Sequence, residues 1–404
     1  MSTYNLRRFA QPDALKNIKP ESLIAFLKPH ESYLSERNFT LAINGSGELE
    51  YEALAAILMD SNEKTPIPMI DALYCIQEMS SDDQFDNLHE LAGSVNLTVE
   101  ADCTPADLAI AIWLHDQELL KRSHAEVLAF TPKSFMYFQA KKKSKKKLLN
   151  PNVEKRQSME KEMDEWFQQN KRGIGSRIFA FPVQEENKTY FLIRHGMPFK
   201  REGKIEEGKS GSIFYRPEFH DVVIYDNEND ELAIFNKSQA KKERNMYLGL
   251  FGSHFFSDTD HFPNDDKYTL APLIDKGADA LACADIPGME DVKLTEIQLQ
   301  FRGPLNDRQT YRSKDFFASL AGRNRAFPNY GELVSASFAV KFEKADRPRT
   351  VKIRTPNIAN FDRKEDSHLI ETWLRKRGFV IEQETDEEHE HTATAHHAIE
   401  AAMA

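Results

Sequence analysis

Cysteine is scarce in this chain, and long apolar runs are missing. Cys75, Cys103 and Cys283 are the only cysteines among 404 residues. Their odd number and wide spacing suit free thiols in a reducing compartment better than a disulfide framework or a zinc site. No apolar run reaches the roughly 18 residues of a membrane-spanning helix, and no apolar segment follows the N-terminal arginines. We therefore expect a soluble, cytoplasmic protein with neither a membrane span nor a signal peptide.

Several motifs that would identify a nucleotide or metal site are also absent. The chain contains no GxGxxG, no GxxxxGK followed by Ser or Thr, no HExxH and no CxxC. These motifs place backbone amides around phosphates or fix metal ligands on one face of a helix, so their absence removes support for those classes of protein. The sequence identifies no cofactor, and it predicts no metal site.

Charge is distributed unevenly along the chain, whose net charge is −11. Residues 1–140 contain 10 Lys and Arg against 21 Asp and Glu, whereas residues 141–380 contain 43 against 36. The segment 381–404 has seven acidic residues and no Lys or Arg. Such asymmetry indicates surfaces for charged partners, or two solvated domains that attract each other. We expect a protein partner on the acidic N-terminal part and nucleic acid on the basic part.

Residues 1–140 have the apolar spacing of helices. Apolar residues recur every three or four positions in stretches such as YEALAAILM and ADLAIAIWL, which predicts a bundle of helices. Thr104 followed by Pro105 is typical of a capping residue and the first helical position. The sequence therefore predicts an acidic helical domain over 1–140.

A lysine-rich segment marks the predicted boundary after residue 140. Residues 141–175 are expected to form a connector followed by a charged helix with a narrow apolar stripe. The lysines either stay solvated because like charges repel, or bind a phosphate backbone without sequence choice. The candidate nucleic-acid contacts in this segment are Lys141, Lys142, Lys143, Lys145, Lys146 and Lys147.

Residues 176–380 change to the period of strands. RIFAFPV and TYFLIRH flank a polar turn, and HDVVIYD and ELAIFN flank another, which predicts two hairpins. Helical patterns stand between later strands, so we expect a basic domain of the α+β class with a largely antiparallel sheet. Residues 381–404 lack large apolar side chains and are predicted to be disordered.

The stretch TYFLIRHG resembles the motif of the histidine phosphatase superfamily, in which a strand delivers Arg-His-Gly to the edge of a sheet. The resemblance implies that His195 accepts a phosphoryl group, that Arg194 binds its oxygens and that Gly196 lets the backbone approach. The family also needs a second histidine, for which His254 and His368 are the candidates. The alternative is that Arg194 and His195 end a hairpin strand at the surface.

A metal-dependent nuclease is a second catalytic hypothesis. The hairpin HDVVIYDNENDELAIFNK supplies Asp221, Asp226 and Glu231 as carboxylates that could converge on Mg²⁺ beside a scissile phosphate. Ala233 stands where the usual lysine would be. The alternative is a solvated hairpin turn.

Cations on a late strand are the remaining candidates for binding. Alternate residues of a strand share a face, so Lys352 and Arg354 should lie together and Arg349 on the other face. These three could contact nucleic acid, or protect a sheet edge against aggregation. We therefore expect a binding or regulatory component of a bacterial-type multi-protein assembly, with an enzyme acting on phosphate esters as the alternative. Any functional pocket should lie within 177–380.

Overall fold

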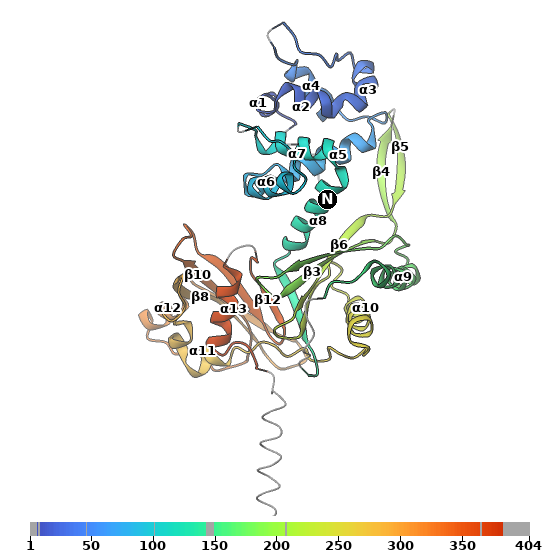
Figure 1. Ribbon diagram of the computed structural model, residues 1–404. Coiled ribbons are helices and arrows are strands. Elements are labelled where there is room, and N and C mark those ends of the chain that lie inside the picture. Colours follow the sequence, from blue (N-terminus) through green and yellow to red (C-terminus); the bar gives the residue numbers. More distant parts are fainter. Residues whose placement is uncertain are drawn as a thin grey trace, which may run out of the picture. The chain divides into compact units, whose positions relative to one another are not determined.

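The chain consists of a helical unit and a unit built on a large antiparallel sheet (Figure 1). The computed structural model describes residues 6, 9–45, 47–100, 102–142, 149–206, 208–363 and 366–382. The two compact units are Met1–Val127 and Leu128–Ala404. The predicted α+β class is confirmed. Among the described residues, no helix combines the length and the apolar character needed to cross a membrane.

The first unit is helical, as predicted. Thr104 caps helix α7 through a reciprocal pair of hydrogen bonds, because Thr104 Oγ1 accepts from Asp107 N and the Asp107 carboxylate accepts from Thr104 N. This capping box satisfies two of the amides that a helix leaves free at its start. The helices are α1 (Pro12–Lys16), α2 (Pro20–Leu27), α3 (Glu31–Glu36), α4 (Tyr51–Met59), α5 (Ile67–Met79), α6 (Phe85–Ser94), α7 (Pro105–His115) and α8 (Gln117–Phe130), within which the unit ends.

The second unit begins before residue 140, the predicted boundary. Residues 134–139 form strand β1 (Ser134–Gln139), which pairs with strands on both sides and so belongs to the sheet. Its sequence SFMYFQ has little polar alternation because both of its faces are largely buried, and such strands resemble buried helix segments in periodicity. The charged helix α9 (Val153–Gln169) also belongs to this unit, since Met159, Met163 and Phe167 enter its core.

The large sheet has the strand order β2-β3-β6-β7-β1-β12-β11-β10-β8-β9, and every neighbouring pair is antiparallel. The hairpins β2–β3 and β6–β7 were predicted, whereas β1, β9 and β12 were not. The strands are β2 (Arg177–Val183), β3 (Lys188–Gly196), β6 (Glu218–Asp226), β7 (Glu231–Phe235), β8 (Met289–Gln300), β9 (Arg308–Arg312), β10 (Glu332–Phe342), β11 (Arg349–Arg354) and β12 (Ile358–Asn360).

Helices cover both faces of the sheet. Helix α10 (Lys241–Phe251) and α9 pack on one face of β2, β3, β6 and β7, where they share a core with Phe191 and Val223. Helix α13 (Ser367–Lys376) packs on the other face, where Trp373 contacts Phe338 of β10. We call these the α10 face and the α13 face. The shorter helices are α11 (Ala271–Asp275) and α12 (Phe316–Gly322).

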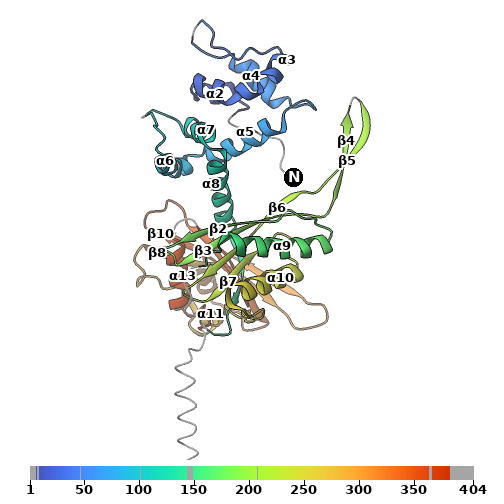
Figure 2. The same cartoon turned by 45° about the vertical axis from the view of Figure 1, so that its right-hand side comes forward.

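A separate hairpin projects from the sheet between β3 and β6 (Figure 2). It consists of β4 (Lys200–Glu206) and β5 (Lys209–Tyr215), which pair only with each other. This hairpin was not predicted, because its residues lack the apolar alternation of a half-buried strand. The predicted disordered segment, apart from its first two residues, lies outside the described residues.

Candidate functional site

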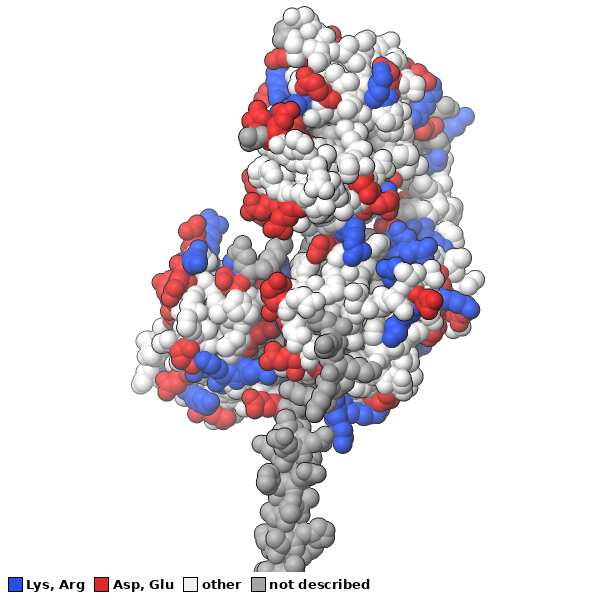
Figure 3. Space-filling view, viewed as in Figure 1, with Lys and Arg blue, Asp and Glu red and all other residues white. Residues whose placement is uncertain are grey.

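Acidic and basic side chains are interspersed over the visible surface of the sheet-bearing unit (Figure 3). The net positive charge of residues 141–380 therefore does not by itself locate a site. A site has to be identified from the local geometry. One pocket concentrates positive charge. It has a volume of about 390 Å³, and four cationic side chains line it, whereas no Asp or Glu is among the described residues that do so. The four are Lys237, Arg244, Lys352 and Arg354, and we call this the cationic pocket.

The strand order of the sheet assembles the cationic pocket. Strands β7, β1, β12 and β11 are consecutive neighbours in the sheet, and alternate residues along each strand share a face. This alternation brings Asn236, Ser134, Asn360 and Lys352 to one surface, although they are far apart in the sequence. The N-terminal part of α10 adds Arg244 at the border of the pocket.

Three of the four cations form no ion pair with a described carboxylate. Arg354 is exposed, the Arg244 guanidinium donates to the carbonyl oxygen of Gln239 at 2.6 Å, and the Lys237 ammonium lies 4.2 Å from the centre of the Phe219 ring. Burial lowers the pKa of Arg244, an effect that the neighbouring Glu243 opposes. These charges are therefore available to an anion.

The fourth cation of the pocket is already paired. Lys352 Nζ lies 2.9 Å from Glu296 Oε1, and Arg312 of β9 pairs with the same carboxylate. These contacts lower the pKa of Glu296, the hydrogen bond from Lys352 most of all. Glu296 thus holds one negative charge beside the pocket.

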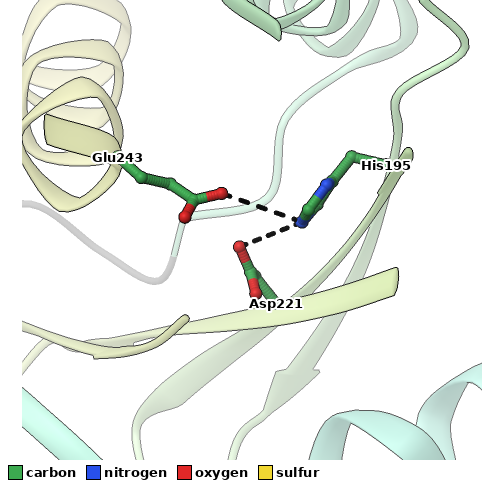
Figure 4. Close-up of side chains that lie close together, drawn as sticks. All are labelled: His195, Asp221 and Glu243. Carbon is green, nitrogen blue, oxygen red and sulfur yellow. Dashed lines mark hydrogen bonds and ion pairs between the residues drawn. The ribbon is translucent and has the colours of Figure 1, made fainter. Parts of the chain in front are cut away.

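Three charged side chains form a buried cluster (Figure 4). His195 projects from β3, Asp221 from β6 and Glu243 from α10, and all three are at most 3% exposed. His195 Nε2 lies 3.1 Å from Asp221 Oδ2 and 3.9 Å from Glu243 Oε1. We call these three residues the buried cluster.

Further polar groups complete the buried cluster. Arg172 donates to the Glu243 carboxylate, and the Tyr247 hydroxyl donates to Asp221 Oδ2 at 2.8 Å. His195 stacks on Phe167, with ring centres 4.5 Å apart. Two carboxylates thus face one guanidinium and one imidazole, so a protonated His195 balances the charge. Buried charges are tolerated when they are paired and hydrogen-bonded in this way.

The protonation state of His195 follows from its hydrogen bonds. Its Nδ1 lies 2.9 Å from the carbonyl oxygen of Gly196, which can only accept, so Nδ1 carries a proton. Burial lowers the pKa of His195, but the hydrogen bond and charge of Asp221, together with Gly196 and Glu243, outweigh burial and raise it. A second proton on Nε2 then donates to Asp221.

The buried cluster supports the residues of the cationic pocket directly. Lys237 N donates to Asp221 Oδ1 at 3.0 Å, and Asn236 Nδ2 donates to Glu243 Oε2 at 3.2 Å. Glu243 also accepts from the Ser238 hydroxyl and immediately precedes Arg244. The cluster therefore fixes the segment 236–238 and the start of α10, from which two of the pocket cations come.

The same three side chains could in principle hold a metal ion, since one ligand atom from each lies within 4.8 Å of the others. An imidazole and two carboxylates are common ligands for divalent ions. However, Arg172 already pairs with Glu243, and a divalent ion there would lie beside a fixed positive charge. The donor set thus fits a proton on His195 better than an ion.

The structure separates Arg194 from His195. The two alternate along β3, so His195 enters the α10 face and Arg194 the α13 face, where its Nε lies 3.8 Å from Glu218 Oε2. His195 is therefore not at the surface, contrary to the alternative in which both residues end an exposed strand. Gly196 permits close packing, because an added Cβ would lie 2.5 Å from the carbonyl oxygen of Arg172.

Within the described residues, neither His254 nor His368, the two candidates for a second histidine, contacts His195. His254 pairs with Glu162 at 2.8 Å, and His368 lies on α13, on the other face of the sheet. The predicted phosphatase residues are thus present, but the described residues do not bring them into one site.

The three carboxylates of the nuclease hypothesis also lie on different faces. Asp221 faces α10, whereas Asp226 and Glu231 are paired across the β6–β7 ladder on the α13 face. Asp226 accepts from the amides of the turn that follows it, and Glu231 pairs with Lys267. The alternation of β6 separates Asp221 from the other two, which the linear spacing did not reveal.

The predicted nucleic-acid contacts are divided as well. Lys352 and Arg354 line the cationic pocket, whereas Arg349 faces the other way, 3.4 Å from an Asp366 carboxylate oxygen and over the Phe342 ring. Lys141 pairs with Asp260 at 2.9 Å and also lies near Asp258. Lys142 is described and does not line the pocket, and Lys143, Lys145, Lys146 and Lys147 lie outside the described residues.

No protein-family model matches the chain, and no curated protein is significantly similar to it. The geometry of the cationic pocket and the buried cluster is therefore the basis for a functional proposal.

Proposed function

We propose that the protein is a nucleic-acid-binding component, which holds a stretch of phosphate backbone in the cationic pocket. The observation that carries this proposal is the convergence of four cations on a pocket that no described carboxylate lines. They come from α10, from β11 and from the segment after β7. A guanidinium can hold two phosphate oxygens at once, and a lysine adds a point charge. The side-chain amide of Asn360 offers a further hydrogen bond.

The size and position of the pocket suit a short stretch of a longer polymer. Its volume of about 390 Å³ is in the range of sites for small ligands, and it lies on a sheet face that continues over β10, β8 and β9. Contacts with phosphate carry no sequence information, so binding should tolerate many sequences and weaken with salt. A regulatory role, with a protein partner on the acidic helical unit, is consistent with this proposal, as is a reducing, cytoplasmic compartment for a chain with three free cysteines.

Hydrolysis of a phosphate ester is the second candidate. The observation that favours it is the position of His195, Asp221 and Glu243 directly behind Asn236 and Lys237 of the pocket. In that case a divalent ion held by the buried cluster would be needed for activity. Metal-dependent cleavage of a bound oligonucleotide would distinguish this enzyme from a binding component.

The test is to measure, by fluorescence anisotropy and at several salt concentrations, how tightly labelled oligonucleotides bind to the full chain. We expect Arg354→Gln and Lys237→Gln each to weaken binding several-fold and to reduce the dependence of log K on log salt by about one unit. The matched control is Arg375→Gln, which removes one exposed positive charge on α13, on the other face of the sheet. Equal effects of all three substitutions would mean that only the net charge matters, and would contradict the proposal.

A further inference from the structure

The hairpin formed by β4 and β5 exposes large apolar side chains. Phe199, at its base, is 63% exposed, Phe214 is 64% exposed and Ile205 is 84% exposed. The two strands pair over seven positions, from Lys200 with Tyr215 to Glu206 with Lys209. Ile213 and Tyr215 are exposed as well. Single exposed apolar residues are normal on a protein surface, but five in one hairpin need an explanation.

Phe199, Ile205 and Phe214 share one face of the hairpin, whereas Ile213 and Tyr215 lie on the other. Phe214 is paired with Arg201, and the alternation of β4 places Phe199, Arg201 and Ile205 on the same side. Serines and Gly203 lie between them, and a Cβ at Gly203 would meet no atom within 4 Å. The space above the middle of the hairpin is therefore open. We call this surface the aromatic face.

The charged residues that the structure describes on the aromatic face are both arginines. Arg201 forms no ion pair with a described carboxylate, and Arg216, which follows β5, places its guanidinium 4.1 Å from the centre of the Phe199 ring. The acidic residue Glu202 lies on the opposite face, where it pairs with Lys200 and accepts from the Tyr215 hydroxyl at 3.0 Å. The described residues of the aromatic face thus combine two phenyl rings with two cations and include no Asp or Glu.

The aromatic face lies at the same end of the sheet as the cationic pocket. The hairpin follows the end of β3 and precedes the start of β6. Because β6 is antiparallel to β3 and to β7, the end of β7 lies beside the start of β6. Phe219 of β6 links the two regions, since it pairs with His195 in register and lies under the Lys237 ammonium. One polymer can therefore follow this end of the sheet from the pocket to the hairpin.

We propose that the aromatic face binds single-stranded nucleic acid, with unpaired bases stacked on Phe199 and Phe214 and phosphates held by Arg201 and Arg216. This inference rests on the proposed function and names the kind of nucleic acid. Exposed aromatic rings beside cations are the means by which proteins hold single strands without regard to sequence, because every base has a stacking face. The bases of a duplex are stacked on one another and cannot use these rings.

The test compares Phe214→Leu with Phe214→Tyr in the full chain, using a labelled single strand and a duplex of the same sequence. Leucine keeps an apolar side chain but cannot stack, so we expect affinity for the single strand to fall about tenfold with an unchanged salt slope. Tyrosine should keep the affinity of the wild type. Arg201→Gln should weaken binding and lower the salt slope. Ile213→Ala changes an exposed residue on the opposite face and is the matched control.

Each other outcome overturns the inference in a recognisable way. If Phe214→Leu binds the single strand as the wild type does while Arg354→Gln is weakened, the proposed function stands and the inference fails. Equal losses for single strand and duplex would also overturn it. If the wild type self-associates in sedimentation experiments and Phe214→Leu does not, with unchanged binding, the aromatic face is covered by a second copy of the chain. If the wild type binds no nucleic acid, both proposals fail.

Discussion

Nε2 of His195 lies 3.1 Å from Oδ2 of Asp221, and both residues are at most 3% exposed. The pair joins the last part of β3 to β6, and through Glu243 it also joins the sheet to α10. Lys237 N donates to Asp221 and Asn236 Nδ2 donates to Glu243, so the pair and Glu243 together hold two residues that line the cationic pocket. Its first expected role is therefore to position the pocket cations.

Replacing His195 by Gln should destabilise the sheet-bearing unit. Removing one partner of a buried ion pair typically costs about 3–5 kcal/mol, because the other charge is left buried without compensation. The free energy of unfolding, measured by chemical denaturation, should fall by about this amount. The neighbouring variant Arg194→Gln changes a half-exposed residue and should stay within about 0.5 kcal/mol of the wild type. Equal stability of the two variants would contradict a structural role for His195.

The stability contributed by His195 should depend on pH. The folded state raises its pKa above the ordinary value of 6.5, so the charged form is favoured by folding. The contribution is then fully present below about pH 6.5 and is lost as pH rises through the raised folded pKa. The difference in unfolding free energy between the wild type and His195→Gln should shrink across this interval. A difference that grew with pH would mean that His195 is neutral when folded.

Metal removal should leave the protein unchanged. Arg172 pairs with Glu243, and a proton on Nε2 of His195 occupies the direction toward Asp221 in which an ion would lie. We therefore expect the melting temperature and oligonucleotide affinity to be the same after treatment with EDTA and after addition of Mn²⁺ or Zn²⁺. A rise in melting temperature with metal in the wild type, absent from His195→Gln, would instead favour the metal-dependent enzyme.

The local periodicity of the sequence predicted helices and strands better than it predicted which of their residues contact one another. The hairpins β2–β3 and β6–β7 could be recognised, because each buries an apolar face of regular spacing. Strand β1 could not, because a strand buried on both faces lacks polar alternation. The β4–β5 hairpin could not be recognised either, because none of its described residues belongs to a buried core.

The candidate site was only partly accessible to sequence reasoning. The alternation of β11 placed Lys352 and Arg354 together, and this prediction agrees with the lining of the pocket. Lys237 and Arg244 were missed, because only the strand order β7-β1-β12-β11 brings them to the same pocket as Arg354. The spacing of residues along the sequence does not reveal this order. Glu243 was missed because it lies in the charged run KKERN, which is typical of a solvent-exposed helix. Its burial against Arg172 depends on the fold.

Glu296 should limit the affinity of the cationic pocket, and its removal should raise that affinity. The carboxylate pairs with Lys352 and with Arg312, so it holds two cations of the α10 face and repels phosphate. Glu296→Gln keeps the size of the side chain and frees both cations. We expect oligonucleotide affinity to rise several-fold at low salt and the salt slope to become steeper, since more phosphates can be neutralised.

The matched control for this prediction is Glu228→Gln, which removes an exposed negative charge in the turn between β6 and β7, at the opposite end of these strands from the pocket. It changes the net charge by the same amount, so any general electrostatic effect appears in both variants. Only a local effect of Glu296 on Lys352 and Arg312 can make the first variant bind more tightly than the second. Equal affinities would place the phosphate contacts elsewhere on the molecule, because a charge beside a bound phosphate acts far more strongly than one beyond the screening length of about 8–10 Å.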